Sequence, residues 1–122
     1  MKDLARFVWM LREELRDIAS KVGWYVGRVY RGVSGILPSR FNVGEKATFP
    51  SFTSTSRDAA AAANFSSAQG VIFVIDLQTG CGVKIDDYSK FKGEQEVLLR
   101  PYCNYVVTRI EGNKVYLTVT QP

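Results

Sequence analysis

The chain has 122 residues, of which 46% are hydrophobic and 23% are charged, and its formal net charge is +4. This length and composition predict one globular domain with a single core. The sequence has no histidine and only two cysteines, which excludes Ser–His and Cys–His catalytic pairs and zinc sites made of imidazoles or four thiolates. Basic residues are interleaved with acidic ones, so we expect no nucleic-acid or membrane partner.

The first half of the chain predicts one helix and two strands. Apolar residues at three- and four-residue steps, with charges between them, indicate an amphipathic helix from about residue 3 to residue 20. Residues 24–31 are β-branched and aromatic and predict a strand. Residues 32–47 are rich in Gly, Ser, Pro and Asn and are interpreted as a long loop. Residues 49–55 predict a second strand.

The second half predicts a short helix and a series of strands. Ser56 is expected to cap the helix, ahead of an alanine run at 59–63. The apolar run 71–77 predicts a strand covered on both faces, and Thr79-Gly80 predicts a turn. The other expected elements are a polar loop at 84–93, a strand at 95–100, and a hairpin of strands 105–110 and 114–120 around Gly112. Together they predict an α+β fold with a mixed or antiparallel sheet.

The cysteines and the N-terminal residues bear on the compartment. Cys81 and Cys103 allow one disulfide at most, and we expect both thiols to be reduced. Residues 1–20 alternate apolar and charged residues and lack the apolar segment of a secretory signal. No apolar run is long enough to span a bilayer. We therefore expect a monomer that is cytoplasmic or is a secreted effector without a conventional signal peptide.

Three short stretches carry side chains suited to chemistry. They are Tyr30-Arg31-Gly32, Phe52-Thr53-Ser54-Thr55-Ser56 and Glu94-Gln95-Glu96-Val97-Leu98. Each alone has a structural explanation, namely a solvated arginine, a strand edge with a helix cap, and two charges on a wet face. In an extended strand, Glu94 and Glu96 would point the same way, and two adjacent carboxylates repel each other. This arrangement, just before a buried apolar stretch, favours a functional role.

Together and in this order, the three stretches resemble the arginine–serine–glutamate branch of the ADP-ribosyltransferases. This branch includes binary actin-modifying toxins, bacterial effectors and vertebrate arginine-specific enzymes. The resemblance covers about residues 24–120 and implies one catalytic domain over 1–122, with an N-terminal helix in 1–22 and a β-rich NAD-binding core in 24–120. The family's other branch has a histidine in its first motif, which this chain lacks. The resemblance implies NAD as co-substrate, no metal, and a protein arginine as acceptor.

The resemblance also implies roles for single residues. Glu96 matches the catalytic glutamate, which would stabilise positive charge developing on the ribose. Glu94 matches the acceptor-selecting position, where a carboxylate implies arginine. Ser54 would hold the catalytic glutamate in its rotamer. Arg31 would bind the diphosphate, and the backbone of Gly32 would hold the nicotinamide carboxamide.

Four more residues are candidates for NAD contacts. Thr55 and Ser56 complete the second motif, although for Ser56 we favour the helix cap. Phe65 would either stack on the pyridinium ring or pack in the core. Some relatives carry an arginine in the loop after the second motif, where residues 66–69 offer none. Arg40 is therefore expected to assist Arg31 in binding the diphosphate.

Other functions are compatible with the same residues. An NAD glycohydrolase would pass ADP-ribose to water, but Glu94 favours transfer to arginine. A catalytically inactive binding module on the same fold is disfavoured because Arg31, Ser54, Glu94 and Glu96 are all present. The last alternative is a small α+β interaction domain in which the pattern is a coincidence.

Overall fold

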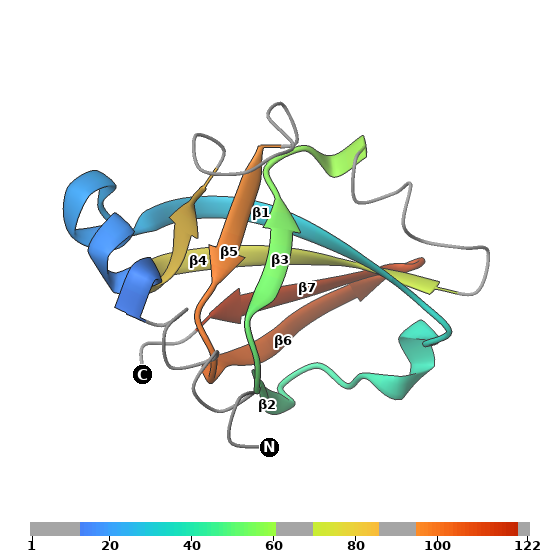
Figure 1. Ribbon diagram of the computed structural model, residues 1–122. Coiled ribbons are helices and arrows are strands. Elements are labelled where there is room, and N and C mark those ends of the chain that lie inside the picture. The colour runs from blue at the N-terminus through green and yellow to red at the C-terminus, as the bar shows by residue number, and fades with distance from the viewer. Residues whose placement is uncertain (1–12, 61–69, 86–94, 120–122) are drawn as a thin grey trace, which may run out of the picture.

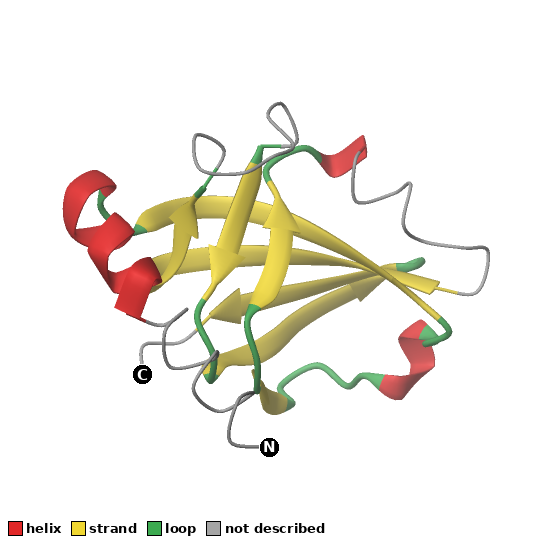
Figure 2. Cartoon of the chain, in the orientation of Figure 1, coloured by secondary structure: helices red, strands yellow, loops and turns green. Residues whose placement is uncertain are grey.

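The computed structural model describes residues 13–60, 70–85 and 95–119. These residues form a mixed seven-stranded sheet, a helix over 13–22 and the 3-10 helix η1 (Pro38–Arg40), and Figure 2 shows that the chain is mostly strand. The strands are β1 (Tyr25–Ser34), β2 (Lys46–Phe49), β3 (Thr53–Ser56), β4 (Gly70–Lys84), β5 (Glu96–Leu99), β6 (Cys103–Glu111) and β7 (Lys114–Val119). No helix in these ranges is long and apolar enough to cross a membrane.

The strand order is β1-β3-β5-β4-β7-β6-β2, and β1 also pairs with β4. β4 connects two groups of strands, because its first part pairs with β1 and β7 and its last residues pair with β5. β4 and β7 run parallel, whereas β3 and β5 are antiparallel. In Figure 1, β3 and β5 cross in front of β1, β4 and β7. The sheet therefore folds over itself, as the predicted α+β class with a mixed sheet allows.

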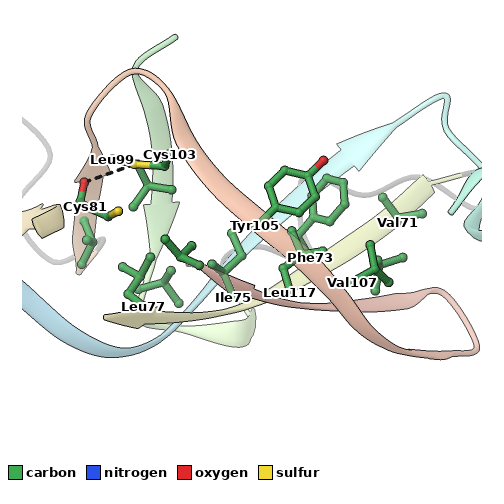
Figure 3. Close-up of a cluster of buried hydrophobic side chains, with 14 residues drawn as sticks. Val71, Phe73, Ile75, Leu77, Cys81, Leu99, Cys103, Tyr105, Val107 and Leu117 are labelled. Carbon is green, nitrogen blue, oxygen red and sulfur yellow. Dashed lines mark hydrogen bonds between the residues drawn. The ribbon is translucent and has the colours of Figure 1, made fainter. Parts of the chain in front are cut away.

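The main core lies between these crossing strands (Figure 3). In β4, Phe73, Ile75 and Leu77 alternate toward this core and are at most 5% exposed. Val74 points to the opposite face of β4 and is still buried. The prediction of a strand at 71–77 is confirmed, and its continuous apolar run is explained by cover on both faces. From β5, Val97 and Leu99 enter the same core, which anchors that strand.

The N-terminal helix packs against β5 and the end of β4. Leu15 and Ala19, one turn apart, are buried with Val83, and Leu98 packs against this group. Gly23 follows the helix with φ +81°, and its N–H donates to the Ala19 carbonyl at 2.8 Å. The predicted amphipathic helix is thus confirmed over 13–22, and its earlier part lies outside the described residues.

The predicted strand at 49–55 is wrong, because it is two strands in different parts of the sheet. β2 ends at Phe49 and pairs with β6, whereas β3 begins at Thr53 and pairs with β5. Pro50 lies between them and has no N–H to donate to a ladder. The loop predicted at 32–47 is also shorter than expected, since β1 runs to Ser34 and β2 begins at Lys46.

The predicted turn at Thr79-Gly80 is also wrong, because β4 continues to Lys84. The pairing with β1 changes register there, so that β4 contains more residues than the facing stretch of β1, and Gly80 has φ +97°. Extra residues on one strand bend it, and beyond this irregularity β4 pairs with β5. The predicted hairpin is confirmed, with Gly112 at φ +60° in the two-residue turn between β6 and β7.

Candidate active site

Three neighbouring strands place the three sequence motifs side by side. Antiparallel pairing sets Tyr30 of β1 opposite Ser56 of β3, and Ser56 opposite Glu96 of β5. Residues far apart in the sequence therefore meet where β3 ends and β5 begins. Alternation along β3 puts Ser54 on the face opposite to the buried Thr55.

Two hydrogen bonds connect the arginine, the serine and the glutamate. Arg31 Nη1 donates to the carbonyl oxygen of Ser54 at 2.9 Å. Ser54 Oγ donates to Glu96 Oε2 at 2.6 Å, a short bond of the kind that an ionised acceptor makes. Ser54 lies opposite Leu98, so Glu96 is its diagonal neighbour on the adjacent strand. The structure thus brings together Arg31, Ser54 and Glu96, which are three of the four principal site residues predicted from the motifs.

These side chains lie at the rim of the core. Arg31 and Glu96 are half-buried and Ser54 is exposed. Val97, the next residue of β5, is fully buried. Glu96 therefore stands on a strand that the core holds firmly, while its carboxylate keeps contact with solvent and with the serine. This placement suits a charged group that must meet a ligand without being buried alone.

Glu94 lies outside the described residues, so its acceptor role stays a prediction. The strand alternation from which its alignment with Glu96 was predicted does not extend through Gln95, because β5 begins only at Glu96 and Gln95 has φ +52°. The orientation of Glu94 stays a prediction. A residue in the left-handed region interrupts the extended conformation on which two-residue alternation depends. The carbonyl oxygen of Gln95 accepts a hydrogen bond from Arg57 N–H at 2.9 Å.

The other polar residues of the second motif have structural contacts. Thr55 is 4% exposed, and its Oγ1 donates to the Val97 carbonyl at 2.6 Å. It joins β3 to β5 from the core side and does not face the site, contrary to the expected NAD contact. Ser56 is not the helix cap, because the helix begins only at residue 59; its Oγ accepts from Asp58 N–H at 3.0 Å in the turn before the helix. Asp58 Oδ1 accepts from Ala60 N–H at 3.0 Å, so Asp58 caps the helix that begins at residue 59.

The three remaining residues predicted to contact NAD differ in how they lie relative to Ser54 and Glu96. Gly32 is half-buried in β1 beside Arg31 and opposite Ile72, next to the site. Arg40 is exposed at the end of η1, which Figure 1 shows beyond the end of β1 and apart from the end of β3. The described residues therefore do not bring Arg40 to Ser54 and Glu96. Phe65 lies outside the described residues.

The chain matches the family model of the NAD:arginine ADP-ribosyltransferases over residues 2–121. The protein belongs to this family. Ecto-ADP-ribosyltransferase 5 of Bos taurus is 36% identical to this chain over 94 residues, which are 75% of this chain and 28% of that protein. NAD(P)(+)–arginine ADP-ribosyltransferase 1 of Gallus gallus is 43% identical over 88 residues, which are 70% of this chain and 26% of that protein. This chain thus spans about a quarter of the length of these relatives.

Solved ADP-ribosyltransferases share the fold. The structure of Vis in complex with agmatine matches with a TM-score of 0.63 and 32% identity, over 88% of this chain and 56% of the Vis chain. Vis is a toxin from Vibrio splendidus. The family and the fold that the motifs suggested are therefore confirmed.

The two cysteines of the chain lie in the main core. Both are free and buried, and Figure 3 shows the hydrogen bond from Cys103 Sγ to the Cys81 carbonyl, at 3.7 Å. A hydrogen bond from the Cys103 thiol and the nearby Arg100 guanidinium lower the pKa of Cys81 to about 7, against the effect of burial. The same thiol contact raises the pKa of Cys103. Within the described ranges, no three Cys, Asp or Glu residues cluster as a metal site.

Proposed function

We propose that this chain transfers ADP-ribose from NAD to an arginine side chain of a target protein and releases nicotinamide. The observation that best supports this is the 2.6 Å hydrogen bond from Ser54 to Glu96, next to the Arg31 contact with the Ser54 backbone. We also propose that residues 1–122 act as one catalytic domain and as a monomer. As for the compartment, we propose the cytoplasm or secretion as an effector.

The proposed reaction breaks the bond between the ribose anomeric carbon and the nicotinamide nitrogen. The bonding electron pair leaves with nicotinamide, and positive charge develops on the ribose. Glu96 would accept a hydrogen bond from a ribose hydroxyl and stabilise that charge electrostatically. Ser54 would keep the Glu96 carboxylate in place through the bond already present. An arginine nitrogen of the target then attacks the anomeric carbon and loses a proton.

Arg31 would hold the diphosphate of NAD. A guanidinium has five N–H donors in a planar fork that matches phosphate oxygens. One of its nitrogens, Nη1, donates to the Ser54 carbonyl, which orients the group beside the strand that carries the catalytic contact. The backbone of Gly32, next along β1, would hold the nicotinamide carboxamide. This arrangement would put the diphosphate near Arg31 and the nicotinamide ribose near Glu96.

Transfer to arginine is proposed on the basis of Glu94 and of the relatives. A carboxylate binds a guanidinium through two hydrogen bonds and can help to remove its proton. The Gallus gallus relative is an arginine ADP-ribosyltransferase, and Vis has been solved with agmatine, a small guanidine. We therefore propose that the acceptor site of this chain also recognises a guanidinium group.

The test uses NAD with agmatine as the acceptor. We expect ADP-ribosyl-agmatine by mass spectrometry and faster nicotinamide release when agmatine is present. Glu96→Gln should abolish both signals with little effect on thermal unfolding, whereas Glu111→Gln, the same change at an exposed glutamate at the end of β6, should not. Release of nicotinamide with no ADP-ribose found on agmatine or on protein would favour an NAD glycohydrolase. An absence of NAD cleavage would favour an inactive binding module.

Two further variants separate the proposed roles. Glu94→Gln should lose transfer to agmatine and keep part of the NAD cleavage, and equal losses of both would count against its acceptor role. Arg31→Ala should chiefly weaken NAD binding, measured by calorimetry. Arg28→Ala is the matched control, because Arg28 is an exposed arginine of the same strand whose partner is Asp76. Unchanged NAD affinity in Arg31→Ala would remove Arg31 from the site.

A further inference from the structure

We propose that Gln95 is a positioning residue, whose left-handed backbone conformation sets the Glu96 carboxylate against Ser54. The inference rests on the proposed function and adds a residue to which the motifs gave no role. Among the described residues, Gln95 and Tyr102 are the non-glycine residues with positive φ, at +52° and +63°. The Cβ atom disfavours this region, so such a residue keeps its conformation only where its surroundings hold it.

Hydrogen bonds from two neighbouring segments hold this part of the backbone. Arg57 N–H, just after β3, donates to the Gln95 carbonyl at 2.9 Å. Ile85 N–H, just after β4, donates to the Glu96 carbonyl at 3.1 Å. The Gln95 side chain is exposed. Gln95 therefore acts through its backbone, and the ends of β3 and β4 clamp the first residue of β5 from both sides.

The clamp determines the point at which the chain enters β5. Glu96 pairs with Ser56, and from that register its carboxylate reaches Ser54 Oγ at 2.6 Å. If Gln95 became extended, the chain would approach β5 from another direction, and either the hydrogen bonds that hold Gln95 and Glu96 or the Glu96 backbone would have to shift. Hydrogen bonds weaken steeply as their geometry departs from the optimum. A small shift of the Glu96 backbone would therefore loosen its contact with Ser54.

Tyr102 provides a control within the same chain. It has the same backbone conformation, it is exposed, and its N–H donates to the Phe49 carbonyl at 2.7 Å in the connection from β5 to β6. Tyr102 follows β5 beyond its last residue, Leu99, whereas Gln95 directly precedes its first residue, Glu96. A substitution at Tyr102 therefore imposes the same kind of backbone cost without touching Ser54 or Glu96.

The experiment compares substitutions that accept or oppose the left-handed region. Glycine and asparagine accept it, whereas a β-branched valine opposes it. We would measure kcat and the KM for NAD in agmatine transfer for Q95G, Q95N, Q95V, Y102G and Y102V, at a temperature where thermal unfolding shows all of them folded. We expect Q95V to lower kcat about tenfold, with a KM for NAD near that of the unmodified chain. Q95G, Q95N and both Tyr102 variants should keep kcat within about threefold.

The outcomes separate this inference from the proposed function. Unchanged kcat in folded Q95V overturns the inference alone, while the loss of transfer in Glu96→Gln still supports the function. Equal losses in Q95G and Q95V also overturn it, because the glutamine side chain would then matter and not the backbone. Equal losses in Q95V and Y102V would show a general structural effect and overturn it as well. An unmodified chain that does not cleave NAD overturns both proposals.

Discussion

Replacement of Ser54 by alanine should slow catalysis without unfolding the protein. Ser54 Oγ donates to Glu96 Oε2 at 2.6 Å, and because Ser54 is exposed its truncation leaves no cavity. A hydrogen bond to a charged group contributes roughly 1.5–3 kcal/mol. Solvent around the exposed serine reduces this contribution, so we expect the lower end of that range. About 1.4 kcal/mol corresponds to about tenfold in kcat.

The assay is steady-state transfer to agmatine, with kcat and the KM for NAD measured separately. The kcat should fall while the KM changes little, because Arg31 and not Ser54 is proposed to hold the diphosphate. Ser20→Ala is the control, since Ser20 Oγ also donates a hydrogen bond, to the Asp17 carbonyl at 2.7 Å on the helix surface. An undiminished kcat in Ser54→Ala would refute the positioning role. A loss as complete as that of Glu96→Gln would also refute it, because Ser54 would then act on the substrate directly.

Three other substitutions or conditions test the structure around the site. Thr55→Val should lower the free energy of unfolding, measured in urea, by about 1–3 kcal/mol, because it removes a buried hydrogen-bond donor to the Val97 carbonyl. Reduced NAD affinity at unchanged stability would instead show that Thr55 contacts NAD. Gly82→Ala should cost about 1–3 kcal/mol, because its Cβ would come within 2.9 Å of Val97 Cγ1, and an unchanged urea midpoint would contradict this packing. The pKa of Cys81 is lowered from 9.0 to about 7, so its thiolate should stabilise the fold at and above pH 9.0 and lose that contribution as the pH falls through about 7. Urea unfolding between about pH 7 and pH 9.0 should show a free energy of unfolding that rises with pH, and a flat profile would contradict the lowered pKa of Cys81. The raised pKa of Cys103 lowers stability as the pH rises, but only above pH 9.0.

Much of the fold followed from patterns that depend on local physics. The continuous apolar run at 71–77 predicted a strand buried on both faces, and Val74 is buried on the side opposite the main core. The hairpin around Gly112 followed from the preference of glycine for a positive φ in two-residue turns. Both signals are local, so they could be read without knowledge of distant partners.

Errors arose where tertiary pairing or backbone strain decided the structure. Gly80 looked like a turn, yet β4 continues through it because β5 supplies a new partner beyond the irregularity. Ser56 looked like the helix cap, although Asp58, two residues later, is an equally good capping type and takes that role. The left-handed conformation of Gln95 has no compositional signal, since glutamine is not a residue that favours it.

The site was predictable as a set of residues but not as a geometry. Arg31, Ser54 and Glu96 were identified from the order of three motifs, and the structure joins them by two hydrogen bonds. The arginine contacts a backbone carbonyl of the serine, a group that every residue carries and that no sequence pattern marks. Thr55 was misplaced although it follows Ser54 in β3, since successive strand residues point to opposite faces and Thr55 therefore faces the core.

The most direct test is a crystal structure of the Glu96→Gln variant with intact NAD bound. It should show the nicotinamide ribose within hydrogen-bond distance of the residue 96 side chain and the diphosphate against the Arg31 guanidinium. NAD bound elsewhere on the sheet, or bound with its nicotinamide ribose away from residue 96 and Ser54, would contradict the proposed catalytic site.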